Sequence, residues 1–234
     1  MTRTVASGLT TLKNFTVQLS QLTEIPPQFF QVCSILQVTS FLRPVMTFTW
    51  MLFFVQETLN IEVIDLAGNR IKTLPESVFA GLVKLRTLRL QRNQITEVGE
   101  TVFRDLVNLK NLELHENLLT RIAQNALAAC RQLTVLNLAR NSLVFDGQVG
   151  PDGRILNRFL ASQPFEALER LNLSYNAVSE LDESLQFNFL NLVSLDLSHN
   201  SFTSFILEHF SFIKVRSIYL KGQCHKFFCF RFFS

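Results

Sequence analysis

Aliphatic residues recur along the chain in a fixed relation to asparagine. Six asparagines each have aliphatic residues three, five and eight positions before them: Asn69, Asn93, Asn117, Asn141, Asn176 and Asn200. Four of the five steps between these asparagines are 24 residues long, and the fifth is 35. Two aliphatic residues with one residue between them match the period-two alternation of a half-buried strand. The pattern therefore predicts one short strand in each unit, with its leucines directed inward.

Units of this size are expected to stack. A unit that has only three inward aliphatic residues in its strand segment cannot bury them alone, so neighbouring units must share a continuous core. An asparagine buried where the chain leaves each strand needs partners for its amide, and a ladder of asparagines can satisfy the backbone of adjacent coils. The six asparagines are thus predicted to be structural.

The spacing LxxLxLxxN resembles the leucine-rich repeat, in particular its 24-residue subtype, which is common in extracellular proteins. The resemblance implies an α/β solenoid, curved like a horseshoe. A parallel β-sheet would line its concave face, and short helical or irregular segments would form its convex side. Phe79 and Phe103, each ten residues after an asparagine, resemble the phenylalanines that form the convex-side core of such repeats. We expect an array of about seven to eight units over residues 9–31 and 57–223.

The long unit and the apolar block between residues 32 and 56 depart from this period. In the long unit, the stretch GQVGPDG predicts a protruding loop within residues 142–165. A phosphate-binding loop is not favoured there, since the lysine or hydroxyl residue opening a helix is missing.

Residues 32–56 contain no Asp, Glu, Lys, Asn or Gly, and removing these 25 residues restores the 24-residue register. We interpret the block as a translated intron, because Gln31-Val32 can be encoded as a splice donor and Phe53 to Gln56 as a pyrimidine-rich acceptor. A long loop of this composition is uncommon. Residues 32–55 are long enough to span a bilayer and could be mistaken for a membrane helix, but Arg43 and Pro44 interrupt them.

The chain ends are expected to be those of a fragment. The phenylalanine-rich residues 224–234 resemble read-through at a second donor and are interpreted as non-native. The first residues lack an apolar core of signal-peptide length.

Composition gives little support for catalysis. The net charge of +3 does not favour a nucleic-acid partner. The four cysteines form no CxxC pair, and the four histidines have no metal-ligand spacing. Cys130 occupies a core position of its repeat. We therefore expect no enzymatic activity, no metal and no cofactor.

Two N-glycosylation sequons begin at Asn14 and Asn172. By repeat position, Asn172 lies on the exposed sheet face, and Asn14 is expected just ahead of the matching strand of the first unit. Together with the repeat subtype, the sequons favour a secreted or ectodomain setting.

The concave sheet is the predicted binding surface. Its outward residues have mixed charge, which suits a protein partner better than a polyanion. Arg89, Gln91, Glu113 and His115 are the candidate ligand contacts.

Several phrases, among them LDLSHNSFTSF and the long unit ending in SQPFEALERLNLSYN, are similar to ectodomains of Toll-family receptors, particularly the insect Toll type. The resemblance implies recognition of a cystine-knot cytokine-like protein or a microbial pattern, receptor dimerisation, and signalling through a cytoplasmic TIR domain that this chain lacks. It places the parent receptor on the extracellular face of the plasma membrane. A freestanding secreted repeat protein and an intracellular repeat scaffold are the alternatives.

Overall fold

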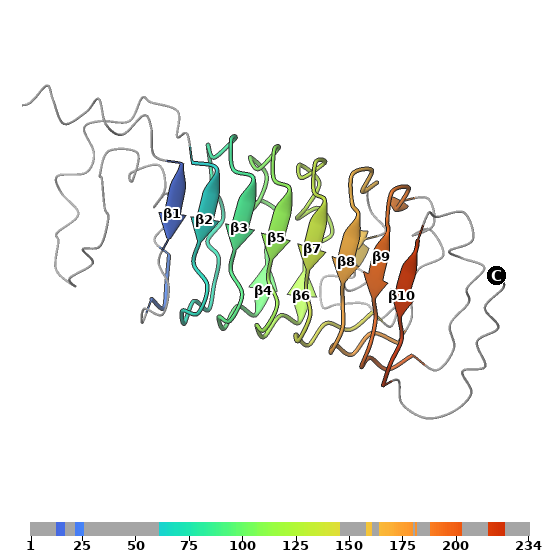
Figure 1. The fold of residues 1–234 in the computed structure, drawn as a ribbon. Helices are drawn as coiled ribbons and strands as arrows, with labels where there is room; N and C mark the ends of the chain where they lie inside the picture. The colour runs from blue at the N-terminus through green and yellow to red at the C-terminus, as the bar shows by residue number, and fades with distance from the viewer. Residues whose placement is uncertain are drawn as a thin grey trace, which may run out of the picture.

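The computed structural model describes residues 13–16, 22–25, 61–145, 158–160, 164–179, 181, 188–202 and 215–222. Within them, one strand from each coil joins a single eight-stranded parallel sheet (Figure 1). Its strands are β1 (Asn14–Thr16), β2 (Val63–Asp65), β3 (Thr87–Arg89), β5 (Asn111–Glu113), β7 (Val135–Asn137), β8 (Arg170–Asn172), β9 (Ser194–Asp196) and β10 (Ser217–Tyr219). The predicted leucine-rich solenoid with a parallel sheet is confirmed.

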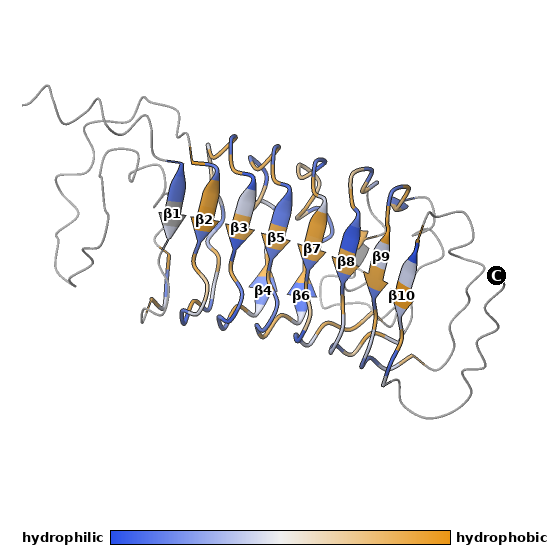
Figure 2. Cartoon of the chain, in the orientation of Figure 1, coloured by the Kyte–Doolittle hydropathy of each residue, from blue (hydrophilic) through white to orange (hydrophobic). Residues whose placement is uncertain are grey.

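The strand register follows the repeat. Leu88 pairs with Leu112, which pairs with Leu136, so equivalent leucines stand side by side in successive coils. In β3, β5, β7, β8 and β9 the middle residue is buried and its two neighbours are at least partly exposed. Figure 2 shows the resulting mixture of hydrophobic and hydrophilic residues along the sheet, with hydrophobic residues prominent in β2 and β7. The alternation leaves one side of the sheet for the core and the other for solvent.

Phenylalanines from successive coils fill the core behind the sheet. Phe79 and Phe103 are fully buried and stack with their ring centroids 6.0 Å apart, as the sequence predicted for core residues. Phe165 and Phe189 stack in the same way at 5.7 Å.

In the long unit, Phe145 meets Phe159 edge to face at 5.9 Å, and Phe159 belongs to the 3-10 helix η3 (Arg158–Leu160). The two ends of the predicted loop 142–165 therefore converge on the core, while residues 146–157 and 161–163 lie outside the described residues.

A second, two-stranded parallel sheet forms on the return segments and was not predicted. It consists of β4 (Glu97–Val98) and β6 (Arg121–Ile122). Val98 and Ile122 are buried, whereas Glu97 is exposed and Arg121 is half-buried. An alternating pair with a β-branched inward residue suits an extended backbone, so two neighbouring return segments pair instead of remaining irregular.

The first two strands pair across the apolar block. Asn14 of β1 is aligned with Val63 of β2, a separation of 49 residues, which equals one 24-residue unit plus the 25 residues of 32–56. The backbone N–H of Arg70 donates to the carbonyl of Leu22, just as Gln94 donates to Ile71 one coil later. Lys13 and Glu62 form an ion pair of 2.9 Å, and this hydrogen bond and charge lower the pKa of Glu62. Residues 32–56 themselves lie outside the described residues.

At the other end, β10 pairs with β9 at a separation of 23 residues, one fewer than the repeat. The tail 224–234 lies outside the described residues. In the part of the chain that the structure describes, no helix is long and apolar enough to cross a membrane.

Candidate functional site: the sheet face and its edge

The predicted asparagines form a ladder of hydrogen bonds that ties each coil to the coil before it. In Asn93, the Nδ2 amide donates to the carbonyls of Leu66 and Leu90, both at 2.9 Å, and Oδ1 accepts from the N–H of Ile71 at 3.1 Å. The same set of bonds recurs at Asn117, Asn141, Asn176 and Asn200. Asn69 is buried and donates to the carbonyls of Leu66 and Ala67 within its own coil.

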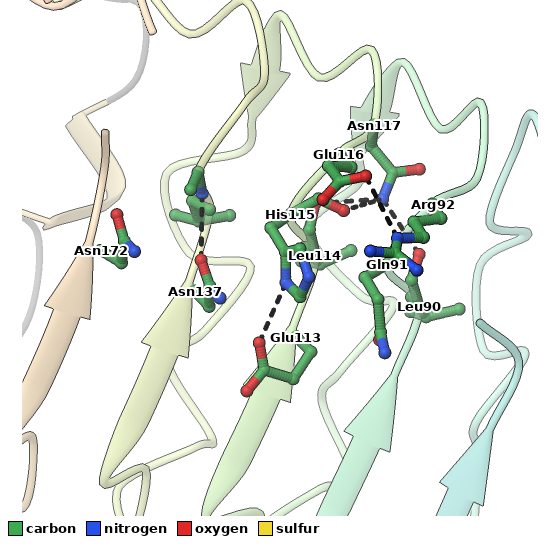
Figure 3. Close-up of polar contacts among 12 residues, drawn as sticks. Leu90, Gln91, Arg92, Glu113, Leu114, His115, Glu116, Asn117, Asn137 and Asn172 are labelled. Atoms are coloured by element: carbon green, nitrogen blue, oxygen red, sulfur yellow. Dashed lines mark hydrogen bonds and ion pairs between the residues drawn. The ribbon is translucent and has the colours of Figure 1, made fainter. Parts of the chain in front are cut away.

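The ladder fixes where each strand ends and therefore where the outward side chains lie. We name the solvent side of the eight-stranded sheet, with the residues that directly follow its strands, the sheet face. The four predicted contacts lie on it in two adjacent coils, Arg89 and Gln91 in the coil of β3, Glu113 and His115 in the coil of β5. Figure 3 shows Gln91, Glu113 and His115. Arg89 is aligned with Glu113 in the sheet.

The four candidate residues differ in how far they are already paired within the chain. Arg89 forms a 3.5 Å ion pair with Asp65, and its side chain is 43% exposed. His115 Nδ1 lies 3.1 Å from the Glu113 carboxylate. Among the described residues, Gln91 Oε1 has no hydrogen-bond partner. That oxygen is buried, so of the four residues the 43% exposed Arg89 is the one best placed to bond a partner.

The two sequon asparagines both lie in strands of the sheet. Asn172 ends β8, and its Oδ1 accepts hydrogen bonds from the Ser174 N–H at 2.9 Å and the Ser174 hydroxyl at 2.8 Å. Asn14 is the first residue of β1, whereas we expected it just ahead of the strand. Pairing with Val63 extends the strand to include it, and the residue is exposed.

A second feature of the surface was not predicted from the sequence. The residue before each of the six ladder asparagines has a left-handed backbone, and so does Gly222, 23 residues after His199. The set is Gly68, Arg92, Glu116, Arg140, Tyr175, His199 and Gly222, with φ between 54° and 73°. We name this set the edge row. Left-handed φ is unfavourable for residues other than glycine. The glycines at both ends of the row were the sequence signal for this backbone.

Side chains of the edge row contact one another from coil to coil. Arg92 and Glu116 form an ion pair of 3.1 Å, visible in Figure 3. Further along, the Arg140 guanidinium lies 4.3 Å from the centre of the Tyr175 ring. The Tyr175 ring stacks on His199 with centroids 4.1 Å apart. These three residues come from consecutive coils and form one continuous stack.

The described residues contain no group of three or more His, Cys, Asp or Glu that could hold a metal ion. Cys130 is 2% exposed, and burial raises the pKa of its thiol to about 12. The thiol is therefore protonated at neutral pH and behaves as a small core residue.

The fold and the asparagine ladder define this part of the chain as a leucine-rich-repeat solenoid. The leucine rich repeat family models agree, matching residues 54–95 and 84–143 with one model and residues 191–213 with another. The comparison with curated protein sequences gives no significant match.

Among solved structures, the chain is similar to Toll from Drosophila in its complex with Spatzle, at 27% identity and a TM-score of 0.62. It is also similar to the ectodomain of the plant receptor kinase GASSHO1/SCHENGEN3 from Arabidopsis thaliana, at 26% identity and a TM-score of 0.55. Each alignment covers 70% of this chain but only 22% and 19%, respectively, of the other. The leucine-rich-repeat domain of APL1, at 19% identity, a TM-score of 0.57 and coverage of 91% and 50%, shares the fold alone.

Proposed function

We propose that this chain is part of the ectodomain of a Toll-type receptor and binds a protein ligand through the sheet face. The observation that carries the proposal is the sheet itself. Eight adjacent strands present a continuous outward surface, on which charges of both signs lie close together. Mixed charge on an ordered surface suits selective recognition of a protein.

The similar structures support the choice of partner. The Toll structure is a complex with Spatzle, and the structure of the plant ectodomain is a complex with CASPARIAN STRIP INTEGRITY FACTOR 2. For the present chain we propose a cystine-knot cytokine-like ligand, with a microbial pattern as the second choice. Because the chain spans a small share of these receptors, dimerisation, a downstream TIR domain and innate immune or developmental signalling belong to the proposed parent receptor.

The proposed setting is the extracellular face of the plasma membrane. Both sequons lie in strands of the sheet, with Asn14 exposed. We propose that Asn14 and Asn172 are glycosylated in the parent receptor.

The sheet-face proposal is tested by replacing one arginine. We expect Arg89→Ala to weaken binding of recombinant Spatzle, as a probe of the cytokine class, by about tenfold, since truncation removes a partly desolvated charged contact. Biolayer interferometry with the immobilised chain measures the dissociation constant. Arg104→Ala is the matched control, because Arg104 is more exposed at 57% and lies on the return segment after Phe103. Equal affinity of the two variants, or no binding by the unchanged chain, would contradict the proposal for this ligand class.

We further propose that residues 32–56 are a translated intron. The support is the register, since the coils on either side of the block pair as consecutive 24-residue units. Long-read sequencing of the transcript tests this directly. A message that keeps the block in all copies would contradict the proposal.

Removing residues 32–56 is expected to improve the solubility of the expressed chain. The block adds a long apolar segment, and open solenoid ends expose further leucines, so the unchanged chain should aggregate. A version that lacks the block and carries end caps should remain monomeric in size-exclusion chromatography. A version that has the same caps but keeps the block is the control, and equal solubility of the two would count against the prediction.

A further inference from the structure

The stack of Arg140, Tyr175 and His199 is the most unusual surface feature of the described residues. Neighbouring residues cover the faces of its two aromatic rings. Tyr175 has Arg140 on the side of the preceding coil and His199 on the side of the following coil. His199 is in turn covered by Gly222, where any Cβ would collide with the imidazole ring. Glycine at position 222 therefore lets the stack close against the last coil.

The stack leaves the charge of Arg140 available. No carboxylate of the described residues lies within ion-pair distance of Arg140, in contrast to Arg92, which is paired with Glu116. A guanidinium whose central carbon lies over a ring still has N–H groups that can bond a further partner. This geometry suits a bidentate bond to a carboxylate, and stacking reduces the side-chain freedom that binding would otherwise remove.

The charge around the stack indicates the sign of its partner. We counted the charged side chains of the edge row and of the described residues within two positions of it. There are four fixed positive charges and one negative charge. These are Arg70, Arg92, Arg140 and Lys221 against Glu116. Leu118, in the coil before Arg140, is 53% exposed, and Tyr175 is 41% exposed. Around Arg140 the surface thus combines an unpaired arginine with exposed apolar area, a combination typical of binding hot spots.

We propose that this edge is a second binding site, for an acidic peptide segment of a protein partner whose carboxylate is held by Arg140. The site is separate from the sheet-face contacts and does not depend on them. A nucleic acid fits less well for two reasons. The ring faces on which bases would stack are already covered. The three cations that have no ion pair among the described residues, Arg70, Arg140 and Lys221, lie at intervals of three coils, whereas a phosphate backbone requires several cations close together.

The site is tested by selecting random peptides on the full chain, immobilised at low density, and then measuring the enriched peptides against variants. We expect peptides rich in Asp and Glu to be enriched, and Arg140→Gln to weaken their binding by about tenfold or more. Tyr175→Ala should have a similar effect because it removes the support of the guanidinium. Arg140→Lys keeps the charge but removes the planar guanidinium that bonds a carboxylate at two points, so the peptide affinity should fall at least about threefold.

Two control variants establish whether the loss of binding is specific to Arg140. Arg92→Gln removes a paired arginine of the same row, and Arg89→Ala removes the sheet-face contact, and both should leave the affinity within about threefold. Circular-dichroism melting verifies that each variant is folded. If Arg89→Ala leaves the affinity for Spatzle unchanged, only the sheet-face proposal fails, because the affinity for acidic peptides is measured separately.

Three results would overturn the proposal. These are enrichment of peptides without acidic residues, equal binding of enriched peptides by the Arg140→Gln and Arg92→Gln variants, and full affinity in Arg140→Lys. A single-stranded oligouridine is measured in parallel. If it binds through Arg140 while no acidic peptide is enriched, the edge is a nucleic-acid site instead.

Discussion

Replacing Asn93 with alanine is expected to lower the free energy of unfolding by about 3 kcal/mol or more, because buried backbone groups in two coils lose their partners. Asn93 is 7% exposed and bonds the carbonyls of Leu66 and Leu90 and the N–H of Ile71. Water cannot easily replace the asparagine at this depth. Urea denaturation followed by circular dichroism measures the change, best in the version of the chain that lacks residues 32–56.

Two further variants make this result specific to the ladder. Asn125→Ala removes an exposed asparagine whose amide bonds Glu100 at 3.2 Å, and it should cost less than about 0.5 kcal/mol. Asn93→Asp preserves the size of the side chain but directs a second oxygen at two carbonyls, so it should destabilise at least as much as alanine. If Asn93→Ala lowers the free energy of unfolding no more than Asn125→Ala does, the ladder bonds do not stabilise the fold.

Replacing Phe103 with alanine is expected to cost about 3–5 kcal/mol, as for other large-to-small changes in a close-packed core. Phe103 is 0% exposed and stacks on Phe79 of the preceding coil. Its loss leaves a cavity in the core shared by two coils, and neighbouring coils are constrained by their own strand pairing. The same urea denaturation measures the effect.

Val107→Ala is the control for the core substitution. Val107 is 44% exposed and lies only four residues away, so its truncation should change the unfolding free energy by less than about 0.5 kcal/mol. If Phe103→Ala and Val107→Ala lower the free energy of unfolding by similar amounts, the buried phenylalanines do not stabilise the core as the structure indicates.

The sequence predicted the strands and the core because both depend on residues close together in the chain. Leu88 and Leu90 precede Asn93 by five and three positions, so the inward side chains and the end of the strand can be inferred from one unit alone. The stacking of identical units then determines the order of the sheet. The short sheet of β4 and β6 was not predictable in the same way, because the pairing of Val98 with Ile122 depends on how two return segments approach each other.

The edge row could not be predicted from the pattern of leucines. Arg140 and Tyr175 are 35 residues apart, across the irregular unit, and only the coil-to-coil spacing brings them into contact. Arg89, Gln91, Glu113 and His115 were found by position in the repeat, yet the pairing of Arg89 with Asp65 depends on side-chain geometry. The role of these four residues in binding stays a prediction.

The direction of the asparagine bonds has a consequence for synthesis of the chain. At Asn93, Asn117 and the later ladder positions, the amide satisfies a carbonyl and an N–H that belong to the coil before. The ladder asparagine of each coil therefore supplies hydrogen bonds that the preceding coil lacks, and none to the coil that follows. As the protein leaves the ribosome from its N-terminus, every new coil adds the bonds that the previous coil still lacks. Folding of the array can thus proceed in the same direction as translation, with one incomplete coil at the growing end.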